Sequence, residues 1–375
     1  MRKQSGVRLV VVLLLSGLLM VWGAGAALAD TSSGAATGTQ QQLTVQQALD
    51  MAMATSSSLI SSSYSIDQAK NKMIQQTEPI TGLSSLAFTP SGNTSAATEG
   101  AFNALVAANL SLQQAKKALQ AGQDTVTYQV YSAYYTILQD EAALDAAQQS
   151  FNLADLQQRI TNLEYQVGGA SQYDVVQETQ SYAAAQNSLD AAKTNLGTDY
   201  QKFNQLVGLA TGDRPVLTDQ PSFAPLVIGS LDAEVSRVLA SDVNISSAQN
   251  TVTEQQEALT VVSQDPAANK SSADTLGAAQ QNLVTEQNNV SQGERNMYYS
   301  IQNLESSQDS LQQALTTAQD NLKMIQVKYD VGMDTKIDVQ TAQSSLNSAQ
   351  LALLKNTISH QLDVMAFETP WAAGV

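Results

Sequence analysis

One stretch of this sequence occurs twice at a constant offset. The segment YQVGGASQYDV at 165–175 returns in outline as YDVGMDTKIDV at 329–339, with Tyr, Val, Gly, a hydroxyl residue, Asp and Val at the same spacing. The offset is 329 − 165 = 164, and it also relates the Tyr pairs at 134–135 and 298–299, since 298 − 134 = 164. No insertion separates these points, so the chain contains one long unit twice.

Each copy of the repeated segment has the residues of a helix end followed at once by a helix start. A Gly takes the left-handed conformation that closes a helix C-terminus, and a hydroxyl residue three positions before an Asp forms a capping box. The glycines are Gly168 and Gly332, the N-caps are Ser171 and Thr335, and the acids are Asp174 and Asp338. Each copy is therefore predicted to be the tight tip of a helical hairpin.

Residues that are apolar at all but one position recur at multiples of seven on both sides of the tips. They are Val130, Ile137, Leu144 and Phe151, then Val175, Tyr182, Leu189, Leu196 and Phe203, with Ile301, Leu315 and Leu322 and then Val339, Leu346, Leu353, His360 and Phe367 in the second half. A seven-residue period predicts left-handed supercoiling. We predict an all-α fold of two tandem long antiparallel coiled-coil helical hairpins.

Composition and caps divide the chain further. The predicted parts are a signal peptide at 1–29, a flexible lead-in at 30–42, a first repeat at 43–208, a linker at 209–230, a second repeat at 231–368 and a frayed tail at 369–375. Within the repeats we expect helices at 44–76, 98–165, 231–263 and 337–367, one from the first tip to about 208, and one that follows a short break at 265–271 and ends at 329, with a loop at 79–97. Pro, Gly, Ser and Thr mark the loops.

The N-terminus has the pattern of a secretory signal. Arg2, Lys3 and Arg8 precede an apolar run at 9–22, and small residues at 27–29 favour cleavage before Asp30. No later segment approaches the roughly 20 apolar residues that a spanning helix requires. We expect an exported mature chain without transmembrane helices.

Charge and cysteine content exclude several partners and cofactors. Removing three leader cations from 18 Lys+Arg leaves 15 against 34 Asp+Glu, so the mature charge is −19 instead of −16. This balance argues against nucleic acid as a partner. The sequence has no Cys and one His, so it offers neither disulfides nor a zinc site. We expect no metal and no cofactor.

Together, the signal, the paired hairpins and the Y-x-V-G-x-x-[S/T]-x-x-D-V tips resemble the TolC-like outer membrane efflux protein family. The segment LTVQQAL at 43–49 is similar to the usual opening of that family, and LVGLATG at 206–212 resembles the close of its first repeat. The resemblance implies a homotrimer whose helices close into a hollow α-barrel. It also implies a periplasmic adaptor, docked at the tips, that links the duct to an inner-membrane pump for efflux or type I secretion.

The resemblance also implies roles for individual residues. The family's adaptor-docking turns match Val167, Gly168, Ser171, Val331, Gly332 and Thr335, and its channel-entrance acids match Asp338 and Asp174. One departure concerns the strands that build the family's outer-membrane β-barrel. The segment at 79–97 shows no clear alternation and 265–271 is too short for a strand pair, so the barrel segments are predicted to be reduced or absent.

Simpler interpretations stand beside these. The tip residues are those that any tight helical hairpin uses for capping, although the Val before each Gly is not required by capping. His360 is expected to be a packed seam residue, and the Tyr pairs at 134–135 and 298–299 to be inter-helix packing. Asp330, Asp334 and Asp338 are either a cation-attracting mouth or solvated charge.

Two other function classes compete with the export duct. The alternative is an exported coiled-coil spacer of the cell envelope without a channel. A hydrolase is disfavoured, because the sequence shows no nucleophile, base and acid in a recognisable arrangement. We therefore expect a passive conduit that is not an enzyme.

Overall fold

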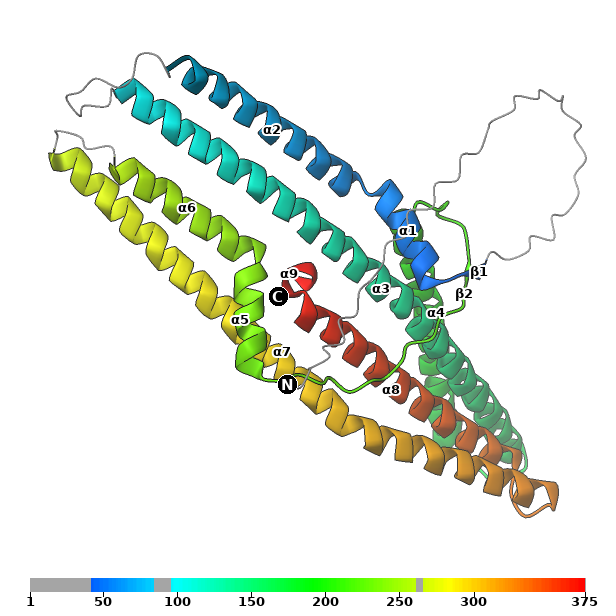
Figure 1. Ribbon diagram of the computed structural model, residues 1–375. Coiled ribbons are helices and arrows are strands. Elements are labelled where there is room, and N and C mark those ends of the chain that lie inside the picture. Colours follow the sequence, from blue (N-terminus) through cyan, green and yellow to red (C-terminus); the bar gives the residue numbers. More distant parts are fainter. Residues whose placement is uncertain (1–41, 84–95, 261–265, 375) are drawn as a thin grey trace, which may run out of the picture. The chain divides into compact units, whose positions relative to one another are not determined.

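The computed structural model describes residues 42–83, 96–260 and 266–374 (Figure 1). Its helices are α1 (Val45–Thr55), α2 (Ser57–Leu83), α3 (Ala96–Gln166), α4 (Gln172–Val207), α5 (Leu231–Ser241), α6 (Val243–Thr260), α7 (Pro266–Asp330), α8 (Lys336–Glu368) and α9 (Pro370–Ala373). Its strands are β1 (Gln42–Leu43) and β2 (Val216–Leu217). The predicted signal peptide and nearly all of the predicted lead-in lie outside the described residues.

The helices pack side by side as a wall. Around the tips, α3 pairs with α4 and α7 with α8, and α8 also packs on α3, so the order across the wall is α4, α3, α8, α7. Toward the other end the order is α2, α3, α6, α7. Both tips lie at the same end of this wall (Figure 1). The predicted all-α fold of two tandem helical hairpins is confirmed.

The main core lies where α3 meets α1, α4 and α8. Val130, Tyr134, Ile137 and Phe203 are all completely buried there, and three of them belong to the predicted seven-residue seams. Away from this region the helices bury narrow seams and expose their outer faces to solvent. A chain rich in Ala, Gln and Ser fits such thin packing, because small side chains let helices approach along a seam.

A two-stranded parallel sheet fixes the predicted linker to the first half. Leu43 of β1 pairs with Leu217 of β2. The buried hydroxyl of Tyr134 donates to the Leu43 carbonyl at 2.9 Å and accepts from the Asp219 N–H at 2.9 Å. The Asp219 carboxylate in turn accepts from the Val45 N–H at 3.0 Å. The linker therefore returns to the start of the first repeat.

Two helices expected to be continuous are each split in two. The predicted helix at 44–76 breaks at Ser56, and the predicted helix at 231–263 breaks at Asp242. Both residues have an extended backbone, with ψ of 110° and 135°. Each side chain accepts a hydrogen bond from the first turn of the following helix: Ser56 from the Leu59 N–H and Asp242 from the Ile245 N–H. Ser and Asp compete with the helix for backbone donors in this way, which periodicity alone does not reveal.

The expected loop and break are also shorter than predicted. Helix α2 continues through Pro79 to Leu83, and α3 already begins at Ala96. Helix α7 starts at Pro266, where a first-turn Pro loses no hydrogen bond because its missing N–H would be unpaired anyway. Residues 84–95 and 261–265 lie outside the described residues.

The predicted frayed tail is wrong. Residues 370–373 form α9, in which Pro370 and Ala372 are buried. The indole Nε1 of Trp371 donates to the Asp124 carboxylate of α3 at 2.8 Å. Arg237 of α5 donates to the Glu368 carbonyl at 3.1 Å. The C-terminal segment is thus held by both halves of the chain.

Candidate functional site: the two hairpin tips

Each tip begins with a helix end of the Schellman type. In the first, the Gly168 N–H donates to the Tyr165 carbonyl at 3.1 Å and the Gly169 N–H to the Glu164 carbonyl at 2.7 Å. The second tip repeats both bonds 164 residues later, at 3.0 Å and 2.8 Å. Gly168 and Gly332 have φ of 82° and 76°, the left-handed conformation that this motif requires.

The next helix starts three residues after the glycine with a capping box. In the first tip the Ser171 hydroxyl accepts from the Asp174 N–H at 3.2 Å, and the Asp174 carboxylate accepts from the Ser171 N–H at 2.8 Å. Thr335 and Asp338 form the same two bonds at 3.3 Å and 2.8 Å. The structure thus gives the two segments one geometry, and the predicted turn residues lie together at each tip.

The two capping carboxylates are stabilised in their charged form. The pKa of Asp174 is lowered first by the Ser171 N–H and then by the Ser171 hydroxyl. For Asp338 the Thr335 hydroxyl is the larger cause and the N–H the second. Both carboxylates are therefore anionic at neutral pH. In a single chain their role is capping, and the predicted role at a channel entrance stays a proposal.

Both tips expose apolar side chains that capping does not need. Val167 is 84% exposed and Val331 is 66% exposed. Met333 and Tyr173 are also exposed beside them, although sequence reasoning did not select these two. Clustered apolar side chains on an otherwise polar surface are typical of a protein contact site.

The acids of the second tip do not converge in the single chain. Asp330 accepts from the Gln326 side chain at 3.0 Å, Asp334 lies 3.9 Å from the Lys328 ammonium, and Asp338 caps α8. Within the described ranges, no group of three or more acidic, His or Cys side chains could hold a metal ion.

His360 lies in the seam of the second half, as its heptad position predicts. Its side chain is buried, its Nε2 lies 3.2 Å from the Glu305 carboxylate, and its ring packs 4.4 Å from that of Phe223. Glu305 also accepts from the Leu226 N–H at 2.6 Å. These contacts hold the linker against α7 and α8 and are structural.

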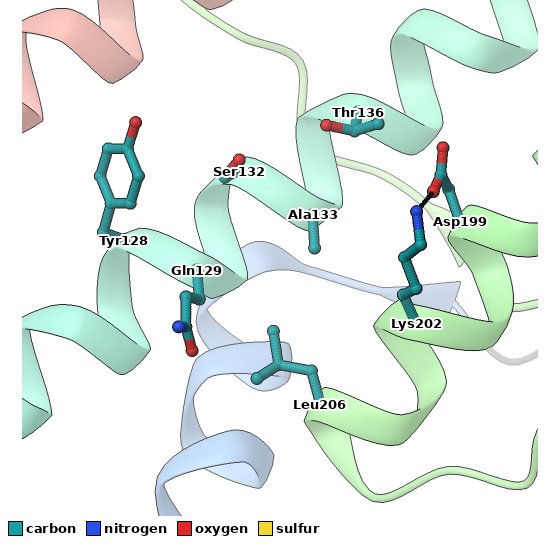
Figure 2. A pocket seen from close by; sticks show the side chains of 8 residues that line it. All are labelled: Tyr128, Gln129, Ser132, Ala133, Thr136, Asp199, Lys202 and Leu206. Atoms are coloured by element: carbon teal, nitrogen blue, oxygen red, sulfur yellow. Dashed lines mark hydrogen bonds and ion pairs between the residues drawn. The ribbon is translucent and has the colours of Figure 1, made fainter. Parts of the chain in front are cut away.

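A pocket of about 510 Å³ lies between α3 and α4 (Figure 2). One wall is formed by residues of α3 between Tyr128 and Thr136, and the other by Asp199, Lys202 and Leu206 of α4. Asp199 and Lys202 form an ion pair at 2.7 Å. Asp140 of α3 neighbours Asp199. Its pKa is raised to about 6, first by burial and second by the Asp199 carboxyl group. Sequence reasoning missed this pocket, because its two walls come from helices whose residues lie more than 60 positions apart in the sequence.

Among the residues placed in the structure, no helix is both long enough and apolar enough to cross a membrane. The sequence matches no protein-family model, and no curated protein matches it either.

Solved structures show that this arrangement of helices is the fold of outer-membrane channels. CusC, described together with transmembrane channel formation, has a TM-score of 0.63 and 12% identity, covering 87% of this chain and 91% of CusC. VceC, an outer-membrane protein of Vibrio cholerae, has a TM-score of 0.58 and 14% identity, and the match covers 88% of this chain and 96% of VceC. The CmeC outer-membrane channel of Campylobacter jejuni has a TM-score of 0.60 and 12% identity, and the match covers 96% of this chain and 95% of CmeC.

At these identities the likeness establishes the fold. The resemblance to TolC-like channels that the sequence implies is thus confirmed at the level of architecture. It extends over almost the whole length of each channel chain, so the similarity is not confined to one hairpin.

Proposed function

We propose that this protein is the exit duct of an export system. Two observations support the proposal: the fold is that of outer-membrane channels over most of the chain, and the chain carries two tips of one geometry at the same end. The duct acts as a passive conduit for efflux or type I secretion, in the cell envelope or outer membrane. Energy comes from a partner pump, and the protein itself is not an enzyme.

In this proposal the duct is a homotrimer that docks tip-first onto a periplasmic adaptor, which links it to the inner-membrane pump. The docking residues are those predicted from the sequence, with Val167 and Val331 as apolar contacts. The exposure of these two valines supports this role, since no contact among the described residues buries them. In the assembled ring, copies of Asp174 and Asp338 would gather at the entrance, where like charges attract cations.

The tips are tested by a photo-crosslinking amino acid placed at Val167 or Val331 in the native host. We expect both sites to capture one periplasmic protein with a long helical hairpin, identified by mass spectrometry. The control site is Val227 in the linker, which is 91% exposed and distant in sequence from both tips. Equal capture from Val227, or no capture from the tips, contradicts tip docking.

The duct itself is distinguished from the coiled-coil spacer by its lumen. We expect the purified mature chain to form threefold particles with a continuous axial hole in electron microscopy. A spacer has no reason to be hollow, so solid or monomeric particles contradict the proposed function.

A further inference from the structure

One buried carboxyl group has no part in the tips or in the caps. Glu294 of α7 is 2% exposed, and neither of its oxygens has a hydrogen-bond partner among the described residues. A buried polar group without a partner destabilises a fold, and a buried carboxylate does so most when it is ionised. The position of Glu294 therefore indicates a role beyond packing.

The first half shows that the same junction can be built from apolar residues. Helices α1 and α5 are equally long and lie 186 positions apart, since 231 − 45 = 186 and 241 − 55 = 186. This offset and the offset of 164 relate three apolar residues to three charged ones: Ala48 to Glu234, Met51 to Arg237 and Val130 to Glu294. The three apolar residues lie in the main core or pack against it. The second half thus replaces part of that core with two acids and an arginine.

Arg237 of α5 holds the end of α8. Its Nε donates to the Glu234 carboxylate at 2.6 Å, and its terminal nitrogens donate to the Glu368 carbonyl at 3.1 Å and to the Phe367 carbonyl at 3.4 Å. The last carbonyls of a helix have no partner within the helix, and a cation there also favours the helix dipole. Arg237 therefore supplies donors at the point where α8 turns into α9.

The segment beyond this contact joins the two halves of the chain. Helix α9 packs on α3 and on α8 (Figure 1), and Trp371 donates to Asp124 of α3 at 2.8 Å. Helix α9 has four residues, and no side chain among the described residues caps its start. So short a helix is not stable without its tertiary contacts. Its place on α3 depends on how the end of α8 is held.

Glu294 can compete for the guanidinium group that holds α8. Arg237 lowers the pKa of Glu294 through its charge, so the two groups lie near each other, although no hydrogen bond joins them. The Arg237 side chain is 41% exposed, which leaves it room to turn. An ionised buried carboxylate without a partner costs more than a carbonyl that loses one donor and gains water. Ionised Glu294 is therefore the better acceptor for Arg237.

The charged groups that act on Glu294 both belong to α5. Burial is the largest cause that raises its pKa, to about 7, while Arg237 lowers the pKa and Glu234 raises it. Glu368, at the end of α8, is exposed. Other charged side chains on the surrounding elements are engaged elsewhere: Arg295 of α7 with Asp232 at 2.5 Å, Asp242 with the Ile245 N–H at 2.8 Å, Asp363 of α8 with Ser300 at 2.8 Å, and Asp124 of α3 with Trp371. Glu294 is thus the group through which pH acts on Arg237.

We propose that Glu294 is a proton-operated latch on the C-terminal segment. With a proton on Glu294, Arg237 holds the end of α8 and α9 stays docked on α3. Loss of the proton draws Arg237 to the Glu294 carboxylate, so the end of α8 loses its donors and α9 leaves α3. The inference does not rest on the proposed function, because every contact in it lies within one chain.

The fluorescence of Trp371 tests the latch, because a chain that begins at Asp30 contains no other Trp. We expect the emission of wild type at pH 5 to be that of a buried indole. Between pH 5 and pH 8.5 it should shift to longer wavelength, with a midpoint near pH 7, while the far-ultraviolet circular dichroism keeps its helical signal.

Two substitutions remove the ionisable group without removing the fold. Glu294→Gln is neutral and nearly the same shape, and Glu294→Val copies the first half. Both should keep the short-wavelength emission at pH 5 and at pH 8.5. Glu254→Gln, at an exposed position on α6, is the matched control and should shift as wild type does.

A third substitution removes the group that does the holding. Arg237→Gln should give the long-wavelength emission at both pH values, because the end of α8 then lacks its donors even when Glu294 is protonated. Short-wavelength emission of Arg237→Gln at pH 5 would show that Arg237 does not hold α9, and would overturn the latch.

Three other results also overturn it. One is a wild-type spectrum that stays the same from pH 5 to pH 8.5. Another is a shift that survives in Glu294→Gln and Glu294→Val, since a different group is then responsible. The third is a loss of helical circular dichroism along with the shift, because the second half then unfolds as a whole and α9 is not released by itself.

Discussion

Glu294 of α7 occupies the position in the second half that Val130 occupies in the first, since 294 − 130 = 164. Val130 is fully buried in the core, and Glu294 is 2% exposed, with neither carboxylate oxygen hydrogen-bonded to any residue that the structure describes. Burial, the largest cause, and Glu234 raise its pKa, while Arg237 lowers it, and the result is a pKa of about 7. The repeat thus places an ionisable group in a seam that is apolar in its counterpart.

We expect the stability of the second half to fall as pH rises from about 4.5 to 7. The folded pKa of Glu294 lies above its ordinary value of 4.5, so in this window the folded state binds more protons than the unfolded state. At about 1.4 kcal/mol per pKa unit, the loss is on the order of 3 kcal/mol. Urea unfolding of Glu294→Val at pH 5 and pH 8 should show this difference removed.

The matched control for that experiment is Glu254→Val, which removes the same charge from an exposed position on α6. It should leave the pH dependence of wild type in place. If Glu294→Val and Glu254→Val respond alike, the buried carboxyl is not the cause.

A β-branched residue at Gly168 or Gly332 should unfold the tip locally and leave the helices intact. Both glycines have positive φ, and no atom of the described residues lies within 4 Å of the position of an added Cβ, so the strain comes from the backbone and not from a clash. The cost is about 1–2 kcal/mol for each residue. We expect Gly332→Val to keep its helical circular dichroism and to lose adaptor capture from a photo-crosslinker at Val331.

Gly277→Val is the control for the tip substitutions, because Gly277 also has open space around it but an ordinary helical backbone. It should retain adaptor capture. Retained capture in Gly332→Val would argue against a docking role for that tip.

The start of α4 and the start of α8 should loosen in acid. The folded pKa values of Asp174 and Asp338 lie below the ordinary value of 3.8, so their stabilisation is present above that pH and is lost as pH falls through the folded pKa. Amide hydrogen exchange, corrected for intrinsic rates, should show protection of the Ser171 and Thr335 N–H groups at pH 6 that persists at pH 3.8 and weakens as the pH falls further.

Asp174→Asn and Asp338→Asn should already lack that protection at pH 6, because an amide is a weaker acceptor than a carboxylate. Asp320→Asn, an exposed position within α7, is the control and should change neither tip. Protection that survives in both tip variants would show that the carboxylates are not what holds the caps.

Local chemistry made the tips predictable, and long-range packing made other parts unpredictable. Each tip consists of a Gly, a hydroxyl residue and an Asp within seven positions, and all their bonds form between neighbours. The buried state of Glu294 and the pocket beside Asp199 depend on helices from distant parts of the sequence. A seven-residue period identifies a seam, but it does not say which helix covers it.

The C-terminal helix α9 illustrates this limit and provides the last prediction. The sequence TPWAAGV has no period, and its helix is fixed by the bond from Trp371 to Asp124, which lies 247 residues earlier in the chain. Trp371→Phe keeps an aromatic ring but leaves the carboxylate of Asp124 without this donor. We expect a loss of about 1–2 kcal/mol in the free energy of unfolding.

Fluorescence reports this contact directly, because the only other Trp is Trp22 in the predicted signal peptide. In a chain that begins at Asp30, Trp371 emission should shift to longer wavelength in Asp124→Ala, as α9 leaves α3 and the indole enters water. Asp155→Ala, which removes a half-exposed acid closer to the tip end of α3, is the control and should leave the emission unchanged. An unshifted spectrum in Asp124→Ala would show that α9 stays docked through its apolar contacts, such as buried Pro370, without the hydrogen bond.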